Sequence, residues 1–174
     1  CLAYALIQQR DAAGLVVFDE KVAQFIPARF RHGQLRQIFG AIETAEGGTA
    51  TDIIKPLEEV ASQVRKRGMV VLTSDLLAPL HRPAADGDSS SRRGGATEGL
   101  ERNLGYLAAG GHELVVFQIL DPQELNFEFD APAMFEDLET GRRIYIDPDK
   151  AREQYQRKLH EHLDNVRRSC EKLG

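Results

Sequence analysis

The chain has 174 residues, of which 42% are hydrophobic and 28% are charged, a composition typical of a single globular domain. Its net charge of −5 argues against general nucleic-acid binding, because such binding depends on a basic surface that neutralises phosphates. No apolar run approaches the roughly 20 residues that a membrane span needs, and no signal peptide is evident. We therefore expect a cytoplasmic segment without membrane contact, with free thiols at Cys1 and Cys170.

The first elements predict a helix followed by a strand hairpin. Residues 1–9 carry apolar side chains at helical spacing, and residues 15–18 form a continuous apolar run typical of a buried strand. A second strand is expected at residues 22–26, ending at Pro27. The polar turn between these strands is so short that they must pair in antiparallel fashion, and a proline suits an edge strand.

The middle of the chain alternates amphipathic helices with buried strands. Its predicted elements are helices at residues 34–44, 53–64 and 97–109, and strands at residues 69–73 and 114–120. A polar tract at about 81–95 has almost nothing apolar to bury, which indicates a flexible surface insertion. This alternation predicts an α/β domain with a mostly parallel, doubly wound sheet and one antiparallel edge strand.

The last part of the chain predicts peripheral strands and one long helix. Alternating side chains at residues 125–129 and the segment 143–146 indicate short strands. A helix is expected at about 149–172, because apolar residues recur there at steps of three and four.

Candidate site residues follow the strands of the predicted parallel sheet. Ligands in such sheets bind beyond the carboxyl ends of the strands, where hydroxyl and carboxylate oxygens suit Mg²⁺. The alternative is that Thr51 and Asp52 are only helix caps and that Asp75 is only a turn residue. The candidates are Asp75, Asp121 and Glu124 after the strands, and Thr49, Thr51 and Asp52 on the loop that opens a helix.

No constellation in the sequence specifies an enzyme. The chain lacks a nucleophile–base motif, a phosphate-binding glycine loop and a Cys-x-x-Cys pair. His160 and His162 are two residues apart on a predicted helix, where they do not face each other, so a solvated helix face is favoured over a metal site. The expectation is a protein without catalytic or cofactor-binding residues.

Several segments of this sequence resemble a bacterial family of unknown function, numbered fifty-eight, over nearly the whole chain. The resemblance lies in residues 8–18, in Thr51 and Asp52, and in residues 70–76, 111–117, 120–124 and 137–141. That family has a von Willebrand factor A-like domain. The resemblance therefore implies a Rossmann-like sheet with one antiparallel edge strand.

The resemblance also implies a metal-ion-dependent adhesion site. Such a site combines an Asp-x-Ser-x-Ser motif after the first strand with a later threonine and aspartate, and these match Thr51 (less closely Thr49) and Asp75. This chain begins at the helix that would follow the first strand, so residues 1–174 are expected to be an incomplete domain. Mg²⁺ is then expected in the complete protein and not in this fragment.

Members of the resembled family are commonly encoded beside MoxR-type AAA+ ATPases. The resemblance therefore implies a non-enzymatic interaction module that works with such an ATPase in the assembly or maturation of other proteins, in a parent protein whose membrane anchor, if any, lies outside this segment. Two alternatives stay open. One is a metal-dependent hydrolase of phosphate esters that uses Asp75, Asp121 and Glu124. The other is a structural scaffold without a ligand.

Overall fold

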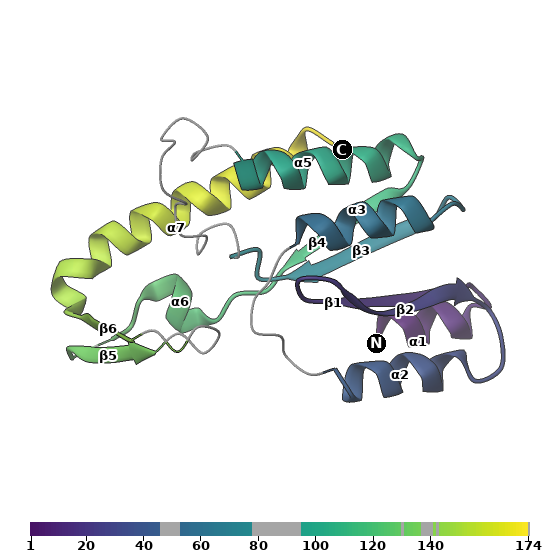
Figure 1. Cartoon of the computed structure of the whole chain (residues 1–174), viewed down its shortest axis with the longest axis horizontal. Coiled ribbons are helices and arrows are strands. Elements are labelled where there is room, and N and C mark those ends of the chain that lie inside the picture. The colour runs from purple at the N-terminus through teal and green to yellow at the C-terminus, as the bar shows by residue number, and fades with distance from the viewer. Residues whose placement is uncertain (46–52, 78–94, 130, 137–140, 142, 174) are drawn as a thin grey trace. The chain divides into compact units, whose positions relative to one another are not determined.

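A computed structural model describes residues 1–45, 53–77, 95–129, 131–136, 141 and 143–173. The chain divides into two compact units, residues 1–60 and 61–174, and each is described by itself. Figure 1 shows their helices and strands. Apart from residue 95, the insertion predicted at about 81–95 lies outside the described residues.

Unit 1 is built on an antiparallel hairpin. Its elements are α1 (Leu2–Gln8), β1 (Ala13–Phe18), β2 (Val22–Arg29), α2 (Gln34–Glu43) and the start of α3 (Ile54–Gln63). The predicted antiparallel pairing of β1 and β2 is confirmed. The predicted end at Pro27 is wrong, because β2 continues to Arg29. The register shifts between Ala13 and Leu15, so Pro27 lies at an irregularity of the ladder, where a missing N–H group is tolerated.

A buried amide side chain joins α2 to this hairpin. Gln34 has no exposed surface, and its Nε2 donates to Ala13 O at 2.8 Å and to Pro27 O at 3.0 Å. Its Oε1 accepts from Arg31 Nε at 3.0 Å. Gln34 therefore supplies a hydrogen-bond donor to two carbonyl groups of the hairpin strands.

Unit 2 contains the parallel strand pair. Strand β3 (Met69–Ser74) pairs with β4 (Glu113–Gln118) without a register shift, and α5 (Gly95–Ala109) lies between them in the chain. Both strands and this helix confirm the predicted elements. Leu72 of β3 is buried, as are Leu100 and Leu104 of α5, so the core of unit 2 includes side chains from both elements.

The segment after β4 differs from the prediction. A strand was expected at residues 125–129, but the chain forms the short helix α6 (Pro122–Asn126). Asp121 caps this helix and Pro122 occupies its first turn, and these start signals outweigh the alternation of apolar side chains. A hairpin of β5 (Ala133–Glu136) and β6 (Arg143–Ile146) follows, and β6 was predicted.

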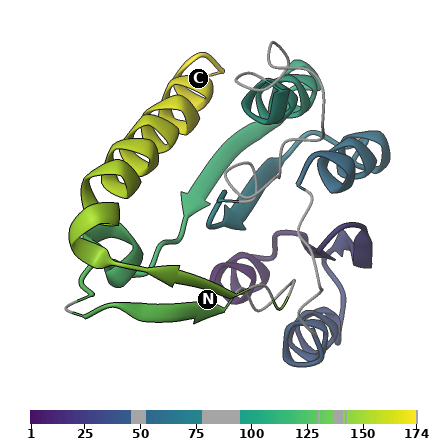
Figure 2. The same cartoon turned by 60° about the vertical axis from the view of Figure 1, so that its left-hand side comes forward.

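The long final helix spans unit 2. The helix predicted at about 149–172 is α7 (Pro148–Glu171), which runs from the β5–β6 hairpin towards α5 (Figure 2). Near its start, the Tyr155 ring lies 4.7 Å from that of Phe127. Near its end, Lys172 Nζ lies 3.0 Å from Glu101 of α5. Helix α7 is thus attached to the rest of unit 2 at both ends.

The mixed α/β class is confirmed, but the described residues do not form one mostly parallel sheet. They form three separate two-stranded sheets, of which only β3–β4 is parallel. The predicted burial of strands on both faces also fails in part, because Met69 and Phe117 are 44% and 51% exposed. Strands β3 and β4 pair only with each other among the described residues, so neither strand lies in the interior of a larger sheet. No helix in the described ranges is long and apolar enough to cross a membrane.

Candidate functional site

The strongest candidate site is the turn that follows β3 at the carboxyl end of the parallel pair. We call residues 74–77 the Asp75 turn. Asp75 is exposed, whereas the next two side chains, Leu76 and Leu77, are 1% and 7% exposed. A charged side chain therefore points outward from a turn whose apolar neighbours are anchored in the core.

Side chains hold the backbone of the Asp75 turn at several points. Ser74 Oγ accepts from Leu76 N at 3.1 Å, and Asp75 Oδ1 accepts from Leu77 N at 3.1 Å. Gln118, the last residue of β4, donates from Nε2 to Asp75 O at 3.0 Å. The end of one strand thus fixes the turn that follows its parallel neighbour.

Leu76 has an uncommon backbone conformation. Its φ of 58° is in the left-handed region, which costs a residue with a Cβ about 1–2 kcal/mol. Such a conformation persists only where the surroundings fix it. At Leu76, core burial and the hydrogen bonds of the turn provide that constraint.

A histidine from helix α7 makes a further contact with this turn. His162 is 5% exposed, and its Nε2 lies 2.7 Å from Leu76 O. Because a carbonyl oxygen only accepts, Nε2 carries the hydrogen of the neutral ring. Burial lowers the pKa of His162 below its ordinary value of 6.5, while the Leu76 carbonyl and the charge of Asp75 act in the opposite direction. The expected solvated position is therefore wrong for His162, although His160 is exposed.

The other two predicted carboxylates cap a helix. Asp121 Oδ1 accepts from Gln123 N at 2.7 Å, and Glu124 Oε2 accepts from Asp121 N at 3.2 Å. This reciprocal pair is a capping box that satisfies N–H groups at the start of α6. Asp121 and Glu124 therefore act as helix caps, a role that the sequence did not predict for them, and their contacts give no support to a hydrolytic site.

The described residues supply one candidate metal ligand and not a complete set. Within the ranges that the structure describes, no three His, Cys, Asp or Glu residues come together in a group that could hold a metal ion. Thr49, Thr51 and Asp52 lie outside the described residues, so the predicted pairing of Thr51 with Asp75 stays a prediction. The fit to a metal is limited to the carboxylate of Asp75, whose Oδ1 already accepts one N–H bond.

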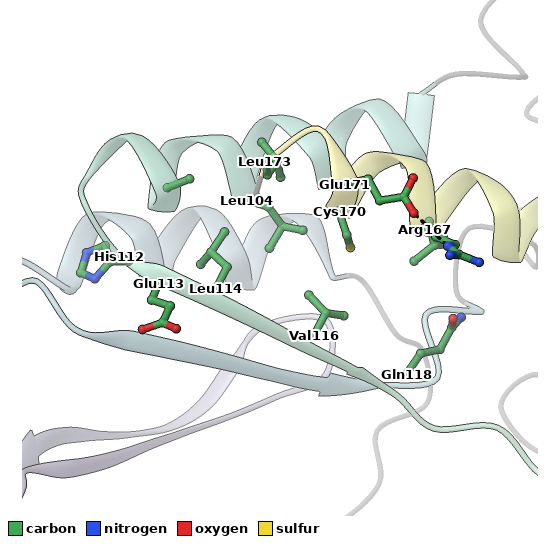
Figure 3. A pocket seen from close by; sticks show the side chains of 12 residues that line it. Leu104, His112, Glu113, Leu114, Val116, Gln118, Arg167, Cys170, Glu171 and Leu173 are labelled. Carbon is green, nitrogen blue, oxygen red and sulfur yellow. Dashed lines mark hydrogen bonds and ion pairs between the residues drawn. The ribbon is translucent and has the colours of Figure 1, made fainter.

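A separate pocket of about 530 Å³ lies between α5, β4 and α7. Figure 3 shows Leu104 of α5, Leu114 and Val116 of β4, and Cys170 of α7 around it. Burial raises the pKa of the Cys170 thiol, with a smaller contribution from the charge of Glu171. The pocket has a mixed lining, because polar side chains such as His112, Glu113 and Arg167 lie beside the apolar ones, and its thiol is protonated at neutral pH. No sequence motif marked it in advance.

Fold and site together define a mixed α/β domain with an exposed carboxylate at the end of a parallel strand pair. The chain belongs to the family described as protein of unknown function DUF58, whose model matches residues 1–165. This match confirms the family resemblance drawn from the sequence.

The similar curated proteins are mycobacterial and uncharacterised. Protein MAV169 of Mycobacterium avium is 26% identical over 154 residues, which cover 86% of this chain and 79% of that protein. Proteins Mb1516 of Mycobacterium bovis and Rv1480 of Mycobacterium tuberculosis are each 26% identical over 167 residues, 92% of this chain. The match covers 46% of these two relatives, so the chain spans about half of their length. No solved structure matches the chain.

Proposed function

We propose that this chain is part of a non-enzymatic protein-interaction module of the cytoplasm, which recognises a partner protein at the carboxyl end of its parallel strands. The observation that carries the proposal is the Asp75 turn. It presents an exposed carboxylate on a backbone that side-chain hydrogen bonds hold in place. A recognition group that is fixed before binding loses little conformational entropy on binding, which favours affinity.

The proposal extends to a von Willebrand factor A-like domain in the longer protein. Each strand of the pairs β1–β2 and β3–β4 has only one partner strand among the described residues. A further strand of the longer protein would extend the parallel pair β3–β4 towards the mostly parallel sheet that the sequence predicts. If that strand carries the Asp-x-Ser-x-Ser motif, Asp75 and Thr51 would join its ligands around Mg²⁺, and a carboxylate of the partner would complete the coordination.

The proposed partner is a MoxR-type AAA+ ATPase, and the proposed role is the assembly or maturation of other proteins. This part rests on the family resemblance. The test is a binding experiment with the protein as it is encoded, including any residues that precede Cys1, against a MoxR-type AAA+ ATPase of the same organism. Binding is measured with Mg²⁺ and with a chelator present.

Two variants with the same charge change make this experiment specific. Asp75→Asn removes the carboxylate of the Asp75 turn, whereas Asp121→Asn removes a carboxylate after the neighbouring strand and keeps an amide oxygen that can cap α6. We expect Asp75→Asn to weaken binding at least about tenfold, as loss of a metal-site group commonly does. Equal binding by both variants and the wild-type protein would refute the interaction site.

A further inference from the structure

Helix α7 and the Asp75 turn are joined by one hydrogen bond between distant parts of unit 2. His162 and Leu76 are 86 residues apart, and Nε2 and O are separated by 2.7 Å. Among the described residues, the other side chains that bond the turn come from the turn itself or from the adjacent strand β4. His162 connects helix α7 to this backbone.

The contact holds the turn at its most constrained residue. Leu76 has a φ of 58°, and its carbonyl is the group to which His162 donates. The Leu76 carbonyl and the Leu77 N–H belong to the same peptide, and that N–H donates to Asp75 Oδ1 at 3.1 Å. A rotation of this peptide would therefore break the hydrogen bond that orients the Asp75 carboxylate. Burial of both Leu76 and His162 keeps water from replacing the bond.

Helix α7 is anchored on both sides of this contact. Gln156 Nε2 donates to Asn126 O at 3.1 Å on the N-terminal side. On the C-terminal side, Lys172 Nζ lies 3.0 Å from Glu101 Oε1. A displacement of α7 at either end would therefore be transmitted to its centre, where His162 lies.

We propose that His162 is a positioning residue for Asp75, and that the seating of helix α7 regulates the proposed binding site through the His162–Leu76 hydrogen bond. The proposal rests on the proposed function for what Asp75 binds, but the coupling between α7 and the turn can be measured without any ligand. Coupling of this kind is reciprocal, so occupation of the site at Asp75 stabilises the seating of α7.

The test compares substitutions that differ in where they place a donor. His162→Gln puts an amide N–H near the position of Nε2, His162→Asn puts it near the position of Nδ1, and His162→Met has no donor. His160→Met is the matched control, because His160 is exposed on the same helix. Amide hydrogen exchange at Leu76 and Leu77 reports the turn, and exchange at the buried Leu72 in β3 reports the fold.

The proposal predicts that His162→Met speeds exchange at Leu76 and Leu77 by about fivefold or more, with Leu72 unchanged. His162→Gln should stay within about twofold of the wild-type rate. If His162→Met also accelerates exchange at Leu72, His162→Asn takes its place in the comparison with His162→Gln. The proposal would be overturned if the exchange rates at Leu76 and Leu77 stay unchanged in His162→Met and His162→Asn. It would also be overturned if His162→Gln accelerates exchange as much as these two variants do.

Measurements of partner binding distinguish a failure of the regulation by α7 from a failure of the proposed function. If Asp75→Asn abolishes binding and His162→Met leaves it unchanged, the regulation by α7 is refuted and the proposed function stands. If Asp75→Asn leaves binding unchanged while His162→Met still accelerates exchange in the turn, the structural coupling holds and the proposed function is refuted.

Discussion

Asp75 and Asp121 both follow strands of the parallel pair, yet their carboxylates make different hydrogen bonds. Asp121 Oδ1 caps α6 through the N–H of Gln123 and forms half of a capping box with Glu124. Asp75 Oδ1 accepts from Leu77 within its own exposed turn. The end of β4 thus uses its carboxylates to start a helix, and the end of β3 presents its carboxylate to the surroundings.

The capping role of Asp121 predicts a graded effect on stability. Asp121→Ala should lower the free energy of unfolding by about 1 kcal/mol, because the N–H of Gln123 loses its acceptor. Asp121→Asn should cost only a few tenths of a kcal/mol, since its amide oxygen still accepts. Urea denaturation measures both values, and equal losses in the two variants would contradict the capping role.

The buried amide of Gln34 predicts a larger effect in unit 1. Gln34→Met keeps the length of the side chain but leaves Ala13 O and Pro27 O without their donor. We expect a loss of about 2 kcal/mol in the free energy of unfolding, because the buried Ala13 carbonyl would be left unsatisfied. Gln37→Met is the control, since Gln37 is exposed and should change stability by less than about 0.5 kcal/mol. A loss of equal size in the control would contradict this role of Gln34.

The lowered pKa of His162 predicts a pH dependence of stability. The unfolded chain binds a proton at His162 near its ordinary pKa of 6.5, whereas the folded chain holds this ring neutral to lower pH. The free energy of unfolding contributed by His162 is therefore complete above pH 6.5 and falls as the pH drops towards the folded pKa, by at most about 1.4 kcal/mol per pH unit.

The Gln variant isolates this contribution. His162→Gln keeps a donor near the Leu76 carbonyl and does not titrate. It should lose less stability than the wild-type protein between about pH 7.5 and about pH 5.5, as measured by denaturant unfolding at each pH. Parallel curves for the two proteins would show that His162 does not titrate differently in the folded state.

The thiols predict a difference in chemical reactivity. Cys1 is exposed, whereas Cys170 is half-buried and its pKa is raised by burial. Because the thiolate is the reactive form, iodoacetamide should modify Cys1 at least about tenfold faster than Cys170 near pH 8. Mass spectrometry of the digested protein measures both rates. Faster reaction at Cys170 would contradict the closed setting of that thiol.

Local patterns in the sequence predicted most elements but not how the strands join. The short turn after Phe18 leaves only an antiparallel hairpin, and α7 follows from its helical spacing. The strand expected at residues 125–129 failed because the capping box of Asp121 and Glu124 determines the start of a helix there. The described strands do not form one continuous sheet, because each of them pairs with only one other strand.

The site was predicted in part. The carboxyl-end rule selected Asp75, whereas the contact of His162 with Leu76 depends on residues 86 positions apart, which no local pattern reveals. One signal pointed to burial of His162, because it lies three residues after Leu159 and four before Val166, both of which are buried. A histidine within an apolar stripe therefore indicates a buried hydrogen bond better than spacing from another histidine does.

The central claim is that the carboxylate of Asp75 is a binding group of the longer protein. Its most direct test is calorimetric titration of Mg²⁺ into that protein and its Asp75→Asn and Asp121→Asn variants. We predict saturable Mg²⁺ binding in the wild-type and Asp121→Asn proteins. The affinity of Asp75→Asn for Mg²⁺ should be at least about tenfold lower. Equal affinity in all three proteins, or no binding in any of them, would contradict it.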